Sequence, residues 1–357
     1  MSRYIHTIIA AVVFLLPIQT LSTEHLSVSD LLAKYAETQD KFKSFIIKSE
    51  DLIEVSSPIL GKEKQRKNLS SEIRFDGSRA NLRVYAWGQV QTGKDFIPKD
   101  KAGYVGFLCD GKQFSRYSTG ADPDLGICII ERDKNRYDLM LKQVIPRGLD
   151  GHEAMGFFSG DEERVDSILL RKPDAISVRD KTEQAGGTEC YVMDAETKYG
   201  KYSVWIDPEH GYNIAKAVVQ RQENDLSYGR TLKKEEYDFC SLKNVRFEKI
   251  DGIWVPMEFD TDLSRNADFG KQINPNMPVR LSFEQKGHHK RTVVILNPDH
   301  DKLGSFVQDD IKNGALVLVV GVEGITYKWR DGKVVDENGR VIMDCRPKNP
   351  EKVKVKG

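Results

Sequence analysis

Histidine is the residue type in this chain that first suggests chemistry, because a neutral imidazole can bind a metal ion. His288 and His289 are adjacent, and His300 stands between Asp299 and Asp301. Adjacent side chains on a strand point to opposite faces, so His288 and His289 cannot easily bind one ion together. We expect a solvated loop here, with no metal site.

The sequence contains none of the common catalytic frames. It has no G-x-S-x-G, no H-E-x-x-H, no Walker loop and no G-x-G-x-x-G. Gly321 and Gly324 stand in a strand-like run without a phosphate-binding pattern. The 54 acidic residues make any pair of carboxylates uninformative as a hydrolase signal. We therefore expect a binding or carrier protein without a cofactor, and a secreted hydrolase is the less favoured alternative.

The cysteines are scattered and form no C-x-x-C motif, which disfavours a zinc or thioredoxin-like site. They are Cys109, Cys128, Cys190, Cys240 and Cys345. In an exported protein, Cys109 with Cys128 and Cys190 with Cys240 are the possible disulfides, because each of these residues lies in strand-like sequence. The alternative is that the thiols are buried small hydrophobic groups. The odd count leaves at least one thiol unpaired within the chain.

The net charge disfavours nucleic-acid binding, and the N-terminal residues indicate the cellular compartment. Lys and Arg total 54 and Asp and Glu total 54 in 357 residues, so no net field attracts nucleic acid. After Arg3, an apolar run of about nine residues is too short to cross a bilayer as a helix. Thr20 and Ser22 provide small residues for cleavage after Ser22. We expect residues 1–22 to be a signal peptide and the protein to be exported to the periplasm or cell envelope. An uncleaved N-terminal anchor is the alternative.

Hydrophobic periodicity predicts one helix followed by many strands. Apolar residues over 27–45 recur every three or four positions, and Ser27 with Asp30 forms a capping box. Afterwards the period becomes two, with turns at Asp76-Gly77 and Asp251-Gly252. About eleven antiparallel strands must curl to hide their edges. We therefore expect a mainly β (α+β) fold, in which a strongly curved antiparallel sheet forms an incomplete, half-open barrel.

Two segments depart from this pattern. Residues 131–185 form a helical insertion in the main domain of residues 23–301, with a capping box at Ser159–Glu162 and a helix that ends before Pro173. The insertion either crosses over the core or acts as a lid. Its lid candidates are Met155, Phe157, Phe158, Ile168 and Leu169. The pattern of residues 302–357 predicts a small C-terminal β extension of two to four strands with a disordered basic end.

The concave face of a curled sheet is filled either by its own side chains or by an apolar ligand. The second half of the chain carries unusually bulky apolar residues on its strands. These cavity candidates are Met193, Tyr202, Val204, Trp205, Ile206, Phe247, Trp254, Met257 and Phe259. The same side chains could instead form an ordinary packed core.

Two stretches carry a resemblance to a known family. Residues 201–216 contain Asp207-Pro208 followed by Gly211, and a later stretch reads Gly252-Ile253-Trp254-Val255-Pro256. Together they resemble the LolA-like outer-membrane lipoprotein-sorting superfamily of periplasmic lipoprotein carriers. The run at 309–311 and the run at 327–335 are similar to tails on large exported members in planctomycete-type bacteria.

This resemblance implies an incomplete barrel, covered by helices, whose hydrophobic cavity holds lipoprotein acyl chains or lipid during transport. Relatives with the same fold bind an anti-sigma factor as envelope-stress sensors. We therefore expect an exported, non-catalytic protein of lipoprotein sorting, with acyl chains as its ligand. The alternative is a sensor or regulatory module that binds an envelope or inner-membrane protein.

Overall fold

The structure is a computed structural model that describes residues 26–58, 64–89, 96–119, 126–134, 152–171, 175–268 and 280–346. The expected signal peptide and the basic end of the chain lie outside these residues, as do residues 135–151 of the expected insertion. Within the described ranges, no helix is both long enough and apolar enough to cross a membrane.

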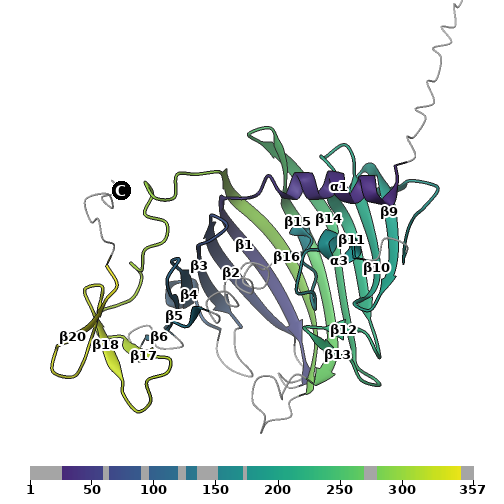
Figure 1. Cartoon of the computed structure of the whole chain (residues 1–357). Helices are drawn as coiled ribbons and strands as arrows, with labels where there is room; N and C mark the ends of the chain where they lie inside the picture. Colours follow the sequence, from purple (N-terminus) through teal and green to yellow (C-terminus); the bar gives the residue numbers. More distant parts are fainter. Residues whose placement is uncertain are drawn as a thin grey trace, which may run out of the picture.

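In the described ranges, eighteen strands belong to one large sheet (Figure 1). In chain order they are β1 (Phe45–Ser56), β2 (Gln65–Phe75), β3 (Ala80–Gly88), β4 (Gly103–Cys109), β5 (Phe114–Ser118), β6 (Ile127–Glu131), β7 (Ile176–Val178), β8 (Glu183–Ala185), β9 (Thr188–Thr197), β10 (Gly200–Asp207), β11 (Asn213–Arg221), β14 (Tyr237–Ile250), β15 (Ile253–Asp268), β16 (Arg280–Leu296), β17 (Leu316–Val319), β18 (Tyr327–Arg330), β19 (Lys333–Val335) and β20 (Val341–Asp344). A separate ribbon joins β12 (Leu226–Ser227) to β13 (Arg230–Thr231).

The strand order gives a curved sheet that stays open. From one edge to the other, antiparallel neighbours follow the order β9, β10, β11, β14, β15, β16, β1, β2, β3, β4, β5 and β6, with β7 and β8 both paired to β9. Among the described residues, no pairing joins β9 to the opposite edge. The mainly β fold with a half-open barrel, expected from the sequence, is confirmed (Figure 1).

The tight turn between β14 and β15 follows from its two residues. Asp251 has φ 47° and Gly252 has φ 82°, and positive φ at both central positions is what the favoured two-residue hairpin turns require. Glycine accepts this conformation without a steric cost, and Asp tolerates it better than most residues.

Helix α1 (Val28–Gln39) covers one face of the sheet, which we call the inner face; the opposite side is the outer face (Figure 1). The expected capping box is present, since the backbone N–H of Asp30 donates to the Ser27 hydroxyl at 3.1 Å. The helix buries Leu31 and Tyr35 against the sheet. It ends at Gln39 rather than near Phe45, because Phe45 already begins β1.

The described part of the insertion consists of short elements. A 3-10 turn, η3 (His152–Met155), precedes the short helix α3 (Val165–Leu169). Outside the insertion, a further 3-10 turn, η2 (Lys99–Lys101), lies before β4. The expected helix start at Ser159 is wrong: α3 begins after its N-cap, Arg164. Ser159 instead contributes its hydroxyl and carbonyl groups to contacts with arginines of the sheet.

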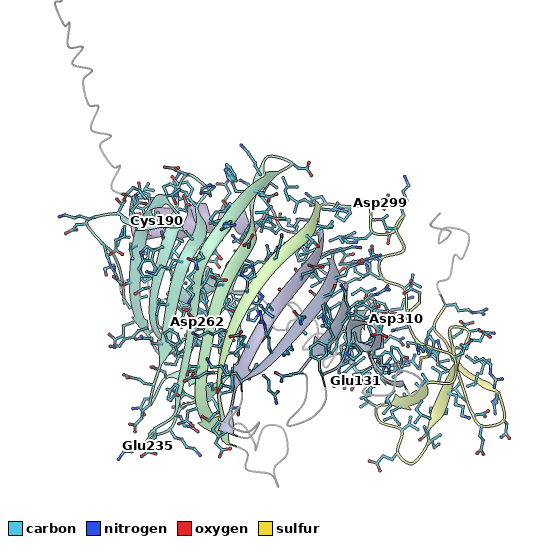
Figure 2. The ribbon with its side chains drawn as sticks, turned by 180° about the vertical axis from the view of Figure 1, so that it is seen from behind. Glu131, Cys190, Glu235, Asp262, Asp299 and Asp310 are labelled. Atoms are coloured by element: carbon cyan, nitrogen blue, oxygen red, sulfur yellow. The ribbon has the colours of Figure 1, made fainter. Side chains whose placement is uncertain are left out.

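The C-terminal tail continues the main sheet. Strand β17 pairs in parallel with β6, and β18, β19 and β20 follow as antiparallel neighbours. The linker of residues 297–315 reaches this edge across the outer face of β3 and β4 (Figure 2). There the Asn81 amide donates to the Ser305 carbonyl at 2.8 Å, and Tyr104 donates to Asp310.

Candidate ligand-binding face

One half of the inner face is a filled core. Inner side chains of β9, β10, β11, β14 and β15 pack against α1 and against the segment of residues 152–171, which we call the plug. Five of the cavity candidates belong to this core, each at most 2 % exposed: Met193, Tyr202, Val204, Ile206 and Phe259. These five side chains pack against one another, α1 and the plug.

Three further candidates have their contacts elsewhere. Trp205 belongs to a separate core cluster with Cys190 and Val192, and its indole N–H donates to Glu183 at 3.0 Å. Phe247 and Trp254 contact His210, with ring centroids at 4.9 Å and 4.7 Å. Phe247 also packs against the inner core, whereas Trp205 and Trp254 do not belong to it.

The lid candidates lie in the plug, which connects two core clusters. Phe158, Ile168 and Leu169 are buried, and Phe158 and Leu169 pack with α1 and with β9 to β15. Met155 and Phe157 pack instead against the neighbouring cluster on the inner side of β1 to β5. The plug thus separates the filled half of the inner face from the other half.

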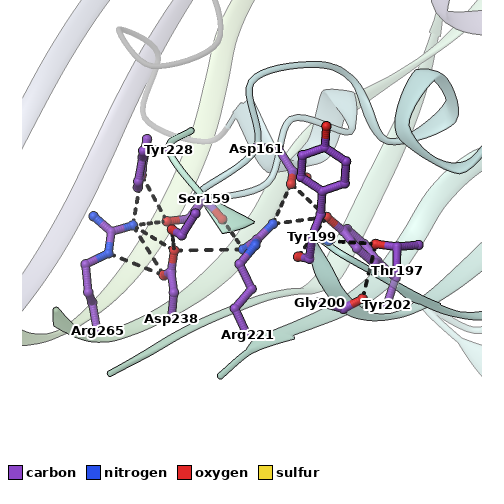
Figure 3. Close-up of polar contacts among 11 residues, drawn as sticks. Ser159, Asp161, Thr197, Tyr199, Gly200, Tyr202, Arg221, Tyr228, Asp238 and Arg265 are labelled. Atoms are coloured by element: carbon purple, nitrogen blue, oxygen red, sulfur yellow. Dashed lines mark hydrogen bonds and ion pairs between the residues drawn. The ribbon is translucent and has the colours of Figure 1, made fainter. Parts of the chain in front are cut away.

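A buried polar network fastens the plug to the sheet (Figure 3). Arg221 of β11, whose side chain is 0 % exposed, donates to the Ser159 carbonyl and to the Asp161 carboxylate. The Tyr202 hydroxyl donates to the same carboxylate at 2.7 Å. Burial alone would lower the pKa of Arg221, but Asp161, Tyr202 and Asp238 together outweigh it and raise this pKa. The guanidinium is therefore held charged.

A second arginine completes the network. Arg265 of β15 donates to the Ser159 hydroxyl at 2.6 Å and to the Tyr228 hydroxyl at 2.8 Å (Figure 3). It also lies 3.2 Å from the carboxylate of Asp238, which accepts a hydrogen bond from Ser227. Because a buried ion pair with several hydrogen bonds is costly to break, this network favours a fixed plug.

The other half of the inner face has apolar side chains that are only partly covered. Val84 of β3, Phe107 of β4 and Met257 of β15 are half-buried and border the cluster that Met155 and Phe157 join. Met257 is the one cavity candidate in this region. Further along, Ile127, Leu316 and Leu318 on β6 and β17 are exposed. We call the inner side of β1 to β6 and β17 the open inner face.

The histidines are not in a solvated loop, and that expectation is wrong. His288 and His289 lie in β16 on opposite faces, and His300 is buried and contacts the Phe75 carbonyl at 2.9 Å. His288 pairs with Asp260 on the outer side. No group of three or more His, Cys, Asp or Glu is arranged to hold a metal ion in the described part of the chain.

On the inner side, His289 links three adjacent strands. Its Nδ1 lies 2.9 Å from the Asp51 carboxylate of β1, and its Nε2 lies 2.9 Å from the Thr261 hydroxyl of β15. Gly287 stands opposite Thr261, and a Cβ there would lie 2.3 Å from Nε2. The glycine therefore leaves room for this chain of hydrogen bonds, which the sequence did not predict.

Arg291 lies two residues further along β16 and differs from Arg221 in the direction of its pKa shift. The residue is 6 % exposed, yet its buried Nη1 has no hydrogen-bond partner. Burial lowers the pKa of Arg291 to about 10, and the nearby charge of Asp51 only partly compensates. Ser49 of β1 is its register partner, and Ser71 of β2 is the register partner of Ser49. Both serines are buried.

All five cysteines are free thiols, so the possible disulfides are not formed. Cys109 and Cys128 belong to different core clusters, and so do Cys190 and Cys240. The cysteines instead pack as small apolar groups. Burial raises the pKa of Cys109 and that of Cys128 to about 12, which keeps both protonated.

Comparison with solved structures returns distant similarities in fold. A DUF1329 family protein from Desulfovibrio piger matches with 12% identity over 76% of this chain and 92% of that chain, at a TM-score of 0.36. A LolA superfamily protein from Nitrosomonas europaea matches with 14% identity over 80% and 100% of the two chains, at 0.35. The MucA/MucB complex of Pseudomonas aeruginosa matches with 9% identity over 75% and 99%, at 0.22. No protein-family model matches the chain, and a search of curated proteins gives no match.

Proposed function

We propose that this chain is an exported, non-catalytic binding protein that holds a hydrophobic ligand against the open inner face. The supporting observation is the contrast between the two halves of the inner face. In one half most large apolar side chains are packed under α1 and the plug. In the other half Phe45, Ile47 and Ile73 form a second buried cluster, and beyond it Val84, Phe107 and Leu318 are partly or largely exposed. The ligand is a lipid or the acyl chains of a lipoprotein in transit through the cell envelope.

The size of the hydrophobic effect makes this role feasible. Each methylene group transferred from water to an apolar surface contributes about 0.8 kcal/mol. An acyl chain of about a dozen methylenes lying along β3 to β6 would gain enough free energy to stay bound during diffusion through an aqueous compartment.

The plug serves as a fixed wall of the site. The buried contacts of Arg221 and Arg265 with Ser159 and Asp161 hold it on the sheet. We therefore place ligand entry at the open side towards β6 and β17, where Ile127, Leu316 and Leu318 reach solvent.

The test is a displacement assay with a fluorescent fatty-acid analogue on the full mature chain. Leu318→Asp puts a charge on the open inner face at a residue that is 42% exposed, whereas Ile295→Asp puts one on the outer face at a residue that is 45% exposed. We expect the first variant to weaken binding about tenfold or more and the second to leave it unchanged. Equal affinities of wild type and Leu318→Asp would contradict the proposed site.

A second candidate function is binding of a protein partner at the edge strand β20. Val341 and Ile342 are 47% and 45% exposed there, and β20 is the last strand of the described sheet. An exposed apolar edge strand can accept an extended segment of another chain by β-augmentation. Val341→Pro should abolish capture of an envelope protein from the host without affecting lipid binding, and unchanged capture would exclude this edge.

A further inference from the structure

We propose that Arg291, Ser49 and Ser71 form an anion-binding site that takes the acidic head group of the ligand on the inner face. This inference rests on the proposed function and deepens it, because it assigns the chemical class of the ligand. The ligand would be an amphiphile with one long apolar chain and a carboxylate or phosphate head.

The first observation is the unusual state of the arginine. A buried guanidinium loses its hydration, and proteins normally repay this loss with hydrogen bonds and an opposite charge. Arg221, which is also deeply buried, has both in Ser159 and Asp161, although its Nε has no partner. Arg291 is 6 % exposed and its Nη1 has no hydrogen-bond partner. A bound anion would supply the missing acceptor.

The second observation is the row of residues beside Arg291. In the register of the sheet, Arg291 stands opposite Ser49, and Ser49 stands opposite Ser71. Adjacent strands lie about 4.8 Å apart, so Ser49 stands one strand spacing from Arg291 and Ser71 stands two, on the same face of the sheet. The guanidinium provides paired N–H donors, and the two hydroxyls add donors on the neighbouring strands. This is the donor set that carboxylate and phosphate oxygens accept.

The nearest acidic residue is already engaged. Asp51, whose charge acts on Arg291, holds the Nδ1 of His289 at 2.9 Å. The ring of His289 is stacked on Phe259 with centroids 5.1 Å apart, and the Arg291 guanidinium lies over the same Phe259 ring at 5.5 Å. Packing therefore fixes the orientation of the guanidinium before a ligand arrives, which lowers the entropic cost of binding.

The same row also provides a direction for the apolar chain. Ser71 stands opposite Val84 of β3, and Val84 stands opposite Val105 of β4. Across the sheet the row therefore begins with the cation of Arg291, continues with the two serine hydroxyls and ends with the aliphatic side chains of Val84 and Val105. A head group at Arg291 would leave its chain along Val84 and Phe107 towards the exposed residues of β6 and β17.

The experiment measures the affinity of the full mature chain for three probes with the same hydrocarbon chain: oleate, 1-oleoyl lysophosphatidate and oleyl alcohol. The variants are Arg291→Met and Arg291→Lys. The matched control is Arg246→Met, which removes an arginine whose side chain is 76% exposed and which pairs with Glu258. Inorganic phosphate alone is a fourth probe.

We expect wild type and Arg246→Met to bind both anionic probes about tenfold or more tightly than the alcohol. Arg291→Met should lose this preference and keep its affinity for the alcohol, while Arg291→Lys should retain part of the preference. In the ligand-free state, Arg291→Met should unfold at the same temperature as wild type or a higher one, because relief from burying a guanidinium with an unpartnered Nη1 offsets the lost contacts with Asp51 and Phe259. A clearly lower unfolding temperature would indicate a structural arginine and overturn the inference.

The failures of the two proposals can be told apart. If the alcohol binds wild type as tightly as the anions do, the head-group site is wrong and the proposed function stands. If none of the three amphiphiles binds, the proposed function fails and this inference fails with it. If inorganic phosphate binds as tightly as lysophosphatidate, the site serves a free anion and the amphiphile assignment is overturned.

Discussion

The carboxylate of Asp161 lies 2.5 Å from the guanidinium of Arg221, and neither side chain has any exposed surface. The two residues stand 60 positions apart in the chain, one in the plug and one in β11. This ion pair is the central link between the plug and the inner face, so its removal tests whether the plug is a fixed part of the fold.

We expect Asp161→Ala to lower the free energy of unfolding by about 3–5 kcal/mol, because it removes the carboxylate that accepts the Arg221 hydrogen bond and leaves only Asp238, at 3.8 Å, beside the buried guanidinium. Urea denaturation followed by circular dichroism measures this change. Glu196→Ala is the control, since Glu196 pairs with Lys201 on the surface and its loss should cost about 1 kcal/mol or less. A cost for Asp161→Ala as small as that of the control would mean that the plug is loosely attached.

Removal of the tail should damage the main sheet. Tyr117, Cys128 and Ile130 on the outer side of β5 and β6 are buried in a cluster with Val317 and Trp329 of the tail. A chain that ends at residue 301 would expose this cluster and the edge of β6, so we expect a lower unfolding temperature and aggregation. Trp329→Ala in the full chain should cost about 3–5 kcal/mol. A truncated chain as stable and soluble as the full one would contradict this prediction.

Ionisation of Glu236 makes the stability of the folded protein depend on pH. Burial alone would raise its pKa, but hydrogen bonds from Arg230 and from the backbone N–H groups of Lys233 and Asp268 lower it to about 2. The folded-state pKa is thus below the unfolded one. Its stabilisation is present above about pH 4.5 and is lost as the pH falls towards 2. Glu236→Gln should therefore destabilise the protein at pH 7 and flatten its stability profile between these values, as measured by thermal unfolding. Parallel profiles for variant and wild type would contradict this.

Thiol titration checks the state of the cysteines. Protein purified without reductant and then denatured should react with five equivalents of a thiol reagent, because all five cysteines are free. In the native state Cys240, which is 0 % exposed and whose pKa burial raises well above its usual value, should not react. If only three thiols, or only one, react in the denatured protein, the chain contains one or two disulfides.

Local features were predictable from the sequence because their causes are local. The capping box of Ser27 and Asp30 and the positive-φ turn at Asp251-Gly252 both depend on neighbouring residues. The alternating pattern also predicted the sheet. By contrast, the pattern could not show that Trp205 packs in a cluster separate from that of Met193, or that the plug fills one half of the inner face.

The polar part of the site was not predictable for a related reason. The run from His288 to Arg291 reads as a basic, solvated segment. Its inner side chains are buried because Asp51, 238 positions away from His289, lies beside them on the neighbouring strand. Such pairings depend on the register of distant strands, and a single sequence contains no direct signal of that register.

The position of β1 in the sheet has a consequence for the order of folding. Phe45 pairs with Leu296, so the first strand cannot complete its hydrogen bonding until the chain has been made almost to its tail. Contacts between residues so far apart in sequence form slowly, because a long loop must close before any contact rewards it. The nascent chain therefore remains without its central strand pair during most of its synthesis. For the exported protein proposed above, the sheet would therefore be assembled only after translocation.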